Sequence, residues 1–389
     1  MKRITGRYET KSIGGETVAA FIPFPLPPSE PPLILAEPLQ DILRKAEQNL
    51  ARLEMAGGMV PSIDWFVYGF ARKEAVISSQ IEGTQASLID LLNYEATERA
   101  GENIGNDLED VCNVLDALKY ARTEMGRKRG LPLSIRLLNE THKRLVKGSR
   151  GSDKHPGEVR TSQNWIGGTR PGNAIYIPPP PQELTGLLGA LEKYIHSDDK
   201  LPPLVRAGLL HAQFETIHPF LDGNGRLGRL FVTLLLEQWG LLSQPILYLS
   251  LFFKRHRAEY YRLLNEIRTQ GDWESWISFF LEGVAGIAEE ATGVARDLFN
   301  LVSTDREKML GYKGSTVVAL RLFERLPTQP IITTANVVKK LDTTKPTAIK
   351  AINLLIKAGI LAETSGRKRD QTFGYGAYLD ILRLGTDTQ

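Results

Sequence analysis

The sequence predicts a mainly α-helical protein with one β-hairpin, followed by a small basic domain near the C-terminus. Most of its 389 residues lie in stretches such as QDILRKAEQNLARLEMAG, where apolar residues recur at three and four positions, the spacing of an amphipathic helix. One stretch, VRTSQNWIGGTRPGNAIYIPPPPQ, instead alternates around a Gly/Pro-rich turn, which is typical of a hairpin. Residues 313–384 carry twelve Lys and Arg against five Asp and Glu, in a chain of net charge +3.

These patterns divide the chain into four expected segments. Residues 1–34 include FIPFPLPPSEPPL, which cannot sustain a helix, and we expect an extended lead-in there. Residues 35–130 form an N-terminal helical region. Residues 131–300 form a second helical region that contains the hairpin, at about 163–178. Residues 313–384 form the basic C-terminal domain.

Composition and cysteine content restrict the cellular setting. The single cysteine, Cys112, excludes an internal disulfide framework and a multi-cysteine zinc site. The apolar run AAFIPFP is too short for a secretory signal and is interrupted by proline, and no uncharged run approaches the length of a membrane span. We therefore expect a cytoplasmic protein with no membrane insertion.

The basic segment has the order helix, helix, turn, helix and hairpin. Its parts are TVVALRLFERL, TTANVVKKL, DTTK, PTAIKAINLLIKAG and ILAETSGRKRDQTFGYGAYLDIL. Pro346 suits the first turn of a helix, and Gly359 suits its end. This order predicts a winged helix-turn-helix domain over 313–384, with residues 345–357 as recognition helix and GRKRD at the hairpin tip, so DNA is an expected partner. The alternative is a helical packing domain with a solvated basic face.

The stretch TIHPFLDGNGRLGR, residues 216–229, concentrates groups that bind phosphate and transfer protons. Gly223, Gly225 and Gly228 formally match the dinucleotide fingerprint G-x-G-x-x-G. That fingerprint follows a buried strand, whereas the preceding LVRAGLLHAQFETIH has helical periodicity. The Gly-Lys-Ser/Thr ending of a P-loop is absent as well, so neither nucleotide-binding fold accounts for the motif.

A glycine-bearing turn that opens a helix explains the same residues better. The first amides of such a helix face an anion. Arg226 and Arg229 are three residues apart, which places them on one helix face, where they can hold two phosphates. Asp222 can bind a divalent cation through those phosphates, and a neutral His218 can accept a proton from a hydroxyl.

HPFLDGNGR together with Arg229 resembles the signature of the Fic (Fic/DOC) family, His-x-Phe-x-Asp/Glu-Gly-Asn-Gly-Arg-x-x-Arg, at every fixed position. Most characterised members transfer AMP from ATP to a hydroxyl side chain of a protein. The resemblance implies ATP as substrate, Mg²⁺ as cofactor, His218 as general base and Asp222 as magnesium ligand. It also implies phosphate binding by Gly223, Asn224, Gly225, Arg226 and Arg229, with Phe220 buried.

A second resemblance lies upstream, in SSQIEG. Ser78, Glu82 and Gly83 resemble the inhibitory motif Ser/Thr-x-x-x-Glu-Gly/Asn that some Fic proteins carry on an N-terminal helix. It implies that the Glu82 carboxylate pairs with Arg229 and occupies the cation that otherwise holds the γ-phosphate of ATP.

Two further expectations come from the resemblance. The hairpin 163–178 corresponds to the family's flap, which registers a target segment by strand addition. Tyr260 and Tyr261 correspond to positions that border the adenine, although adjacent helical residues point about 100° apart, so core packing suits one of them equally well. His211 and His256 are given no role.

The leading hypothesis is a protein adenylyltransferase restrained by Glu82. A second hypothesis is a DNA-binding regulator that uses the Fic core as an ATP sensor, and a third is removal of AMP from a modified protein, with Glu82 orienting water. Family outliers move phosphate, UMP or phosphocholine, whereas an intact His218 and Arg229 favour AMP. Related proteins often form dimers, so a homodimer is expected.

Overall fold

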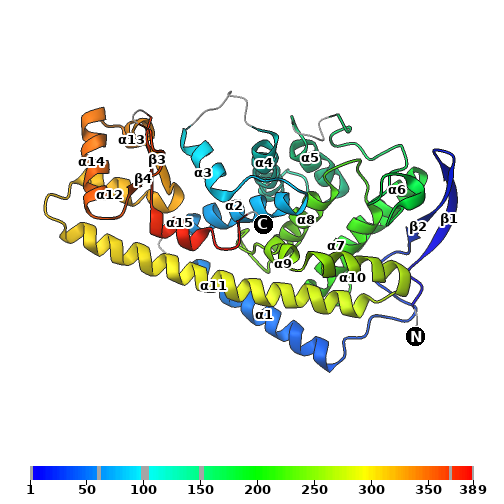
Figure 1. The fold of residues 1–389 in the computed structure, drawn as a ribbon. Helices are drawn as coiled ribbons and strands as arrows, with labels where there is room; N and C mark the ends of the chain where they lie inside the picture. The colour runs from blue at the N-terminus through cyan, green and yellow to red at the C-terminus, as the bar shows by residue number, and fades with distance from the viewer. Residues whose placement is uncertain (1–2, 59–62, 98–104, 149–152, 368–369, 388–389) are drawn as a thin grey trace.

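The computed structural model describes residues 3–58, 63–97, 105–148, 153–367 and 370–387. Helices dominate it, and its strands form one two-stranded and one three-stranded sheet (Figure 1). The mainly α fold class is therefore confirmed. Among the described residues, none of the helices combines the length and apolarity needed to cross a bilayer.

The N-terminal segment differs from the expected extended lead-in, because it contains a β-hairpin. Strand β1 (Gly6–Ile13) pairs antiparallel with β2 (Glu16–Pro23). Gly14 and Gly15 connect the strands with φ angles of 58° and 84°, which glycine adopts at no steric cost and which match the twist of a two-residue turn. The prolines that indicated an extended chain lie mostly after this hairpin.

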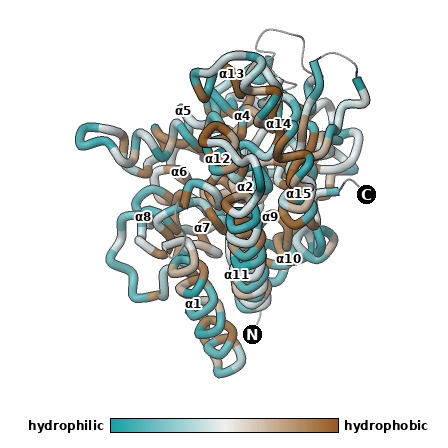
Figure 2. The backbone as a smooth tube through the Cα atoms, turned by 90° about the vertical axis from the view of Figure 1, so that its left-hand side faces the viewer, coloured by the Kyte–Doolittle hydropathy of each residue, from teal (hydrophilic) through white to brown (hydrophobic). Residues whose placement is uncertain are grey.

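Eleven helices follow up to residue 311 in the described chain. Before the flap they are α1 (Glu37–Gly58), α2 (Asp64–Ile81), α3 (Leu88–Thr97), α4 (Asn106–Gly126) and α5 (Ile135–Leu145). After the flap they are α6 (Pro181–Ile195), α7 (Pro203–Ile217), α8 (Asn224–Gln238), α9 (Ser250–Arg255), α10 (Arg257–Gln270) and α11 (Trp273–Gly311). Helix α11 runs along the whole molecule with α1 beside it (Figure 1). Figure 2 shows apolar positions recurring between polar ones along both helices, as the sequence periodicity predicts.

The predicted flap hairpin, 163–178, contains a single antiparallel bridge, between Ile166 and Tyr176, instead of two strands. Gly167 and Gly168 both have positive φ angles, 69° and 72°, and a 3-10 turn (Pro171–Asn173) lies between the two arms. These residues turn the chain away from the extended conformation, so the ladder cannot continue. The flap is thus a bridged loop.

The C-terminal elements are α12 (Val317–Phe323), the 3-10 turn η2 (Leu326–Thr328), β3 (Ile331–Thr333), α13 (Thr334–Leu341), α14 (Lys345–Lys357), β4 (Ala362–Glu363), β5 (Thr372–Gly374) and α15 (Gly376–Leu382). They match the expected helices and a shorter form of the expected hairpin, whose last residues form helix α15, and they add strand β3. The strands form an antiparallel sheet in the order β3-β5-β4. Of the predicted basic tip GRKRD, Lys368 and Arg369 lie outside the described residues.

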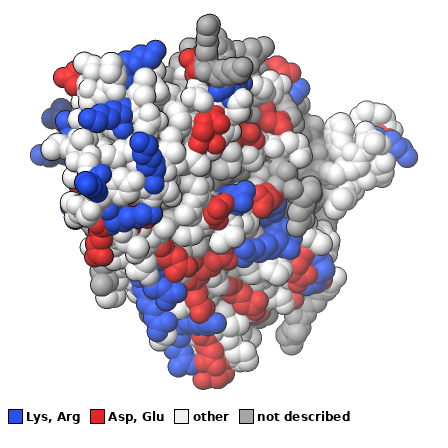
Figure 3. Space-filling model, turned by 60° about the vertical axis from the view of Figure 1, so that its left-hand side comes forward, with Lys and Arg blue, Asp and Glu red and all other residues white. Residues whose placement is uncertain are grey.

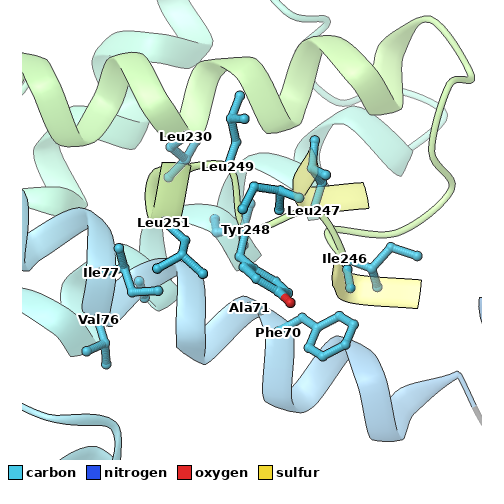
Figure 4. Packing of buried hydrophobic residues seen from close by; sticks show 14 of the residues in the cluster. Phe70, Ala71, Val76, Ile77, Leu230, Ile246, Leu247, Tyr248, Leu249 and Leu251 are labelled. Atoms are coloured by element: carbon cyan, nitrogen blue, oxygen red, sulfur yellow. The ribbon is translucent and has the colours of Figure 1, made fainter. Parts of the chain in front are cut away.

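Helix α2, which carries the predicted inhibitory motif, is held by apolar packing. Figure 4 shows side chains of α2 facing the segment 246–251 that leads into α9. The rings of Phe70 and Tyr248 meet edge to face with centroids 5.2 Å apart, and Val76 and Ile77 are fully buried. Burying a side chain of this size stabilises the fold by about 1.5–3 kcal/mol, so apolar packing fixes the body of α2 against the core.

Candidate active site

The motif 216–229 forms a tight turn between α7 and α8. Helix α7 ends at His218, whose backbone is left-handed (φ 49°), and α8 begins after Gly223 (φ 76°). The Asn224 side chain closes the turn, since it accepts from Phe220 N at 2.9 Å and donates to Phe220 O at 2.8 Å. The turn therefore presents the first amides of a 15-residue helix, which is a suitable place for an anion.

Two glycines of the motif are required by close approach. A Cβ on Gly225 would lie 2.2 Å from Glu82 Oε1, and one on Gly223 would lie 2.9 Å from Val146 Cγ1. Real Cβ atoms do not approach so closely, so a side chain at Gly225 would displace the Glu82 carboxylate, and one at Gly223 would press on Val146 and would also be strained by the positive φ of that position. The absence of side chains leaves the helix N-terminus open toward Glu82.

Arg229 of α8 contacts two of the three predicted inhibitory residues, Ser78 in α2 and Glu82 directly after the helix. Its Nε donates to Ser78 Oγ at 2.9 Å, and its Nη2 donates to Ser78 O at 2.9 Å and to Glu82 Oε1 at 2.6 Å. Arg229 is 3% exposed, while the Glu82 side chain is 37% exposed. Gly83 follows with φ 98° and turns the chain away from the helix.

The electrostatics of this contact favour the ionised pair. Burial acts to raise the pKa of Glu82, but the Arg229 guanidinium outweighs it and holds that pKa below its ordinary value. Burial likewise acts to lower the pKa of Arg229, and the Glu82 carboxylate reverses this and raises it. Both groups are charged at neutral pH, so Arg229 already has an anionic partner.

Arg226 already has a carboxylate partner, which limits how much of its guanidinium can join Arg229 in binding phosphate. Its Nη1 donates to Asp110 Oδ1 of α4 at 2.7 Å, and both side chains are at most 5% exposed. Its Nη2 lies 3.8 Å from Asp222 Oδ1. Arg226 therefore connects α4 to the turn, and only part of its guanidinium can face a ligand.

Asp222 is the most accessible charged group of the turn, with a side chain 41% exposed. Its Oδ1 accepts from Gly223 N at 2.5 Å. The described residues contain no cluster of three or more His, Cys, Asp or Glu arranged for a metal. One exposed carboxylate still fits Mg²⁺, because that ion commonly takes one or two carboxylates and completes its shell with water and substrate phosphates.

His218 sits at the end of α7 as a neutral base. Burial, together with the nearby positive charge of Arg160, lowers its pKa to about 4. The imidazole is therefore unprotonated at neutral pH and can accept a proton.

Two residues that were not predicted from the sequence, Arg160 and His142, hold the turn through hydrogen bonds to its backbone oxygens. Arg160, 3% exposed, donates through Nε to His218 O at 3.0 Å and through Nη2 to Pro179 O at 2.6 Å. His142 of α5 accepts from Gly157 N at 2.9 Å through Nδ1, so its Nε2 carries the proton and donates to Asp222 O at 2.9 Å. No sequence signal marked either residue, since each acts across the fold on backbone atoms.

The two tyrosines of α10 occupy different environments. Tyr260 is 1% exposed, and its hydroxyl is 2.9 Å from His211 Nε2, so the expectation that it borders the adenine is corrected in favour of core packing. Tyr261 is 42% exposed, with the Arg257 guanidinium 5.7 Å from its ring centroid. Only Tyr261 offers an accessible aromatic face.

The fold and site define a helical protein built around a helix, a glycine turn and a second helix suited to anion binding. Residues 132–236 match the Fic/DOC family, and residues 40–123 match the Fic/DOC family N-terminal region. The chain therefore contains a segment that matches the Fic/DOC family, preceded by one that matches the family's N-terminal region.

Relatives with known names agree with this assignment. The chain is 29% identical over 220 residues to "Protein adenylyltransferase Fic" of Drosophila erecta and of Drosophila melanogaster, which covers 54% of this chain and 41% of each relative. It thus spans about two fifths of their length.

Solved structures share the fold. A Fic family protein from Desulfovibrio desulfuricans G20 superposes with a TM-score of 0.56 at 19% identity, covering 89% of this chain and 98% of that one. Fic-1 of C. elegans (residues 134–508) gives a TM-score of 0.50 at 21% identity, covering 68% and 73%.

Proposed function

We propose that this protein transfers AMP from ATP to a hydroxyl side chain of a target protein and that Glu82 restrains the reaction. The contact between Glu82 and Arg229 carries the proposal, because a buried arginine beside an open helix N-terminus is a natural γ-phosphate ligand. The relatives' name, protein adenylyltransferase, supports the same chemistry.

The residues of the turn have distinct tasks in this reaction. Neutral His218 takes the proton as the target's hydroxyl oxygen attacks the α-phosphorus and pyrophosphate leaves. The amides of Gly223, Asn224 and Gly225, with Arg229 and the free part of Arg226, stabilise the charge on the phosphates. Asp222 would hold Mg²⁺, which when bound supplies charge neutralisation to those phosphates.

Restraint follows from competition for Arg229. While Glu82 holds Nη2, the γ-phosphate lacks its cation, and the phosphate chain takes a pose in which the α-phosphorus is not in line with the hydroxyl. Movement of Glu82 frees the guanidinium and opens the productive pose.

The flap offers one edge for a target segment. The outer arm of the flap, residues 174–178, is already covered, because Phe21 N of β2 donates to Ile177 O at 3.0 Å. On the inner arm, residues 163–167, the backbone groups of Trp165 make no hydrogen bond to other backbone within the described chain. The positive φ of Gly167 ends the extended stretch, so this free edge is short. The exposed side chains of Trp165 and Ile175 flank it, and we assign target docking to this inner arm.

The C-terminal elements support a second candidate function, DNA binding. Their order of helix, strand, two helices and two strands suits a winged helix-turn-helix domain. Lys345, Lys350 and Lys357 are exposed along α14, and Arg367 is exposed beyond β4. Figure 3 shows Lys and Arg side chains gathered in the upper left of the view, at the height of these elements, while both signs of charge mix lower down. Phosphate contacts by such a face are salt-dependent.

The test compares wild type, Glu82→Gly and Glu82→Gly/His218→Ala. Each protein is incubated with magnesium ATP and a cell extract, and added AMP is measured by intact mass. We expect AMP on Glu82→Gly and none on the double variant, because the base is then missing. Absence of AMP from every variant, with ATP binding retained, would reject the transferase.

Two further measurements separate the alternatives. Loss of AMP removal from a modified protein in Glu82→Gly would assign Glu82 to hydrolysis instead of restraint. A salt-sensitive, sequence-preferring shift of duplex DNA would support the regulator without excluding the transferase.

A further inference from the structure

The last turn of α2 is held on two opposite faces. Ser78 and Glu82 are four residues apart and both contact Arg229, as residues on one helix face do. Gln80 lies between them and faces the other way. Its Nε2 donates to Thr386 O at 3.0 Å, 306 residues further along the chain, and to Ala86 O at 3.0 Å.

Lys254 of α9 completes this second contact. Its Nζ donates to Gln80 Oε1 at 2.8 Å and to Asp387 O at 2.9 Å. Gln80 therefore uses both atoms of its amide, and the chain after α15 is held by a glutamine and a lysine together. Thr386 is 1% exposed, so this segment is packed against the core.

Helix α15 extends the contact along α2 and connects it to the C-terminal domain. Leu382 is fully buried, and a Cβ on Gly69 of α2 would lie 2.7 Å from its Cδ1. At the other end, Tyr378 donates to Pro327 O of η2 at 3.1 Å. One short helix of the C-terminal domain thus contacts both the η2 turn of that domain and helix α2, whose end precedes Glu82.

We infer that Gln80 is a positioning residue for Glu82, and that its contact with Lys254 and residues 386–387 is part of the restraint on AMP transfer. The inference rests on the proposed function. A tilt or unwinding of the end of α2 would withdraw Glu82 from Arg229, and Gln80 opposes that movement because it holds this end to the segment after α15. Loosening the Gln80 contact therefore makes displacement of Glu82 by the γ-phosphate easier.

The inference gives the C-terminal domain a role in control. Any ligand of that domain that shifts α15 also shifts residues 386–387, and the shift reaches Gln80 two residues from Glu82. Coupling of this kind acts through a change in the population of the released state.

The test is a double-mutant cycle between Gln80 and Glu82. Gln80→Ala is made in wild type and in Glu82→Gly, with Gln48→Ala, an exposed glutamine of α1, as the matched control. AMP transfer is measured by intact mass. In the wild-type background we expect Gln80→Ala to raise transfer about 3- to 10-fold, the equivalent of one lost hydrogen bond. In the Glu82→Gly background we expect no change, because nothing is left to restrain.

An increase or a decrease of similar size in both backgrounds would overturn the inference, since Gln80 would then act on the fold or the active site in general. Lys254→Met is the second variant. It removes the other half of the contact and should reproduce the pattern of Gln80→Ala.

Amide hydrogen exchange gives a readout that does not need activity. Exchange at residues 80–84 should be faster in Gln80→Ala and Lys254→Met than in wild type, with exchange in the body of α2 unchanged. Unchanged exchange at 80–84 would refute the contact's role. If Glu82→Gly itself gains no AMP transfer, the proposed function fails, and the exchange experiment still decides whether Gln80 holds the helix end.

Discussion

The Glu82 carboxylate at the end of α2 accepts a 2.6 Å hydrogen bond from Arg229 of α8, 147 residues further along the chain. Arg229 is buried, and leaving a buried cation without an anion costs several kcal/mol. Glu82 supplies the anion in this structure. Under the proposed function a phosphate of ATP would take the same place, so the two would compete for Arg229.

Replacing Glu82 by glutamine should release the restraint in part. The amide retains the shape and an acceptor oxygen for Arg229, but it lacks the charge that makes the hydrogen bond strong. We expect AMP transfer by Glu82→Gln to fall between wild type and Glu82→Gly, with a gain of about 10-fold over wild type. Initial rates with magnesium ATP measure this, and a rate no higher than wild type would show that charge does not carry the restraint.

Arg160→Ala should lower both stability and activity. The side chain donates to carbonyls on both sides of the site, including His218 O, and its loss leaves buried acceptors unpaired. We expect a loss of about 3 kcal/mol in the free energy of unfolding, measured by denaturant titration, and transfer in the Glu82→Gly background reduced by about 100-fold because His218 is displaced. Arg170→Ala, which removes an exposed ion pair with Glu16, is the control and should change stability by less than about 1 kcal/mol.

The rate of AMP transfer should not change with pH near the pKa of an ordinary histidine. Burial and Arg160 lower the pKa of His218 to about 4, so the base form is present above that pH and is lost only as the pH falls toward it. For Glu82→Gly we expect kcat/KM to show no histidine-dependent change between about pH 5.5 and 8. A change in kcat/KM centred near the ordinary histidine pKa of about 6.5, with no matching change in ATP affinity, would contradict the role of His218 as a neutral base.

Substitutions of the two tyrosines of α10 should have different effects, one on ATP binding and the other on stability. Tyr261→Ala removes an exposed ring, and we expect KM for ATP to rise about 5- to 150-fold with little change in stability, since stacking of a base contributes about 1–3 kcal/mol. Tyr260→Phe removes the hydroxyl that pairs with buried His211, and we expect a loss of about 1–2 kcal/mol of stability with KM unchanged. The opposite pattern would place the adenine elsewhere.

Asp110 should prove essential to the fold because it neutralises Arg226. Asp110→Ala removes the carboxylate that the buried guanidinium of Arg226 contacts most closely and leaves Asp222 at 3.8 Å, and we expect a loss of about 3–5 kcal/mol in the free energy of unfolding. Asp116→Ala, at an exposed position of the same helix, serves as the control and should be nearly neutral. Equal stability of the two variants would show that Arg226 does not need this partner.

Local patterns predicted much of the fold. Periodicity identified the helices, and the predicted recognition helix matches α14, Lys345–Lys357, because a proline at its start and a glycine after its end mark both limits. The hairpin β1–β2 was not predicted, because the proline-rich stretch that follows it indicated an extended chain over the whole segment. The flap was predicted as a longer hairpin than it is, because two glycines with positive φ interrupt its ladder.

By itself, the sequence determined the helical fold class and the composition of the turn 216–229, since both depend on spacing between neighbouring residues. Its resemblance to a family motif also singled out Glu82 and Arg229. Only the tertiary structure decided that Arg226 is taken by Asp110, that Tyr260 is in the core while Tyr261 is not, and that Gln80 meets the segment after α15. The physical reason is that periodicity specifies which face of a helix is buried, whereas the packing of distant helices specifies what that face contacts.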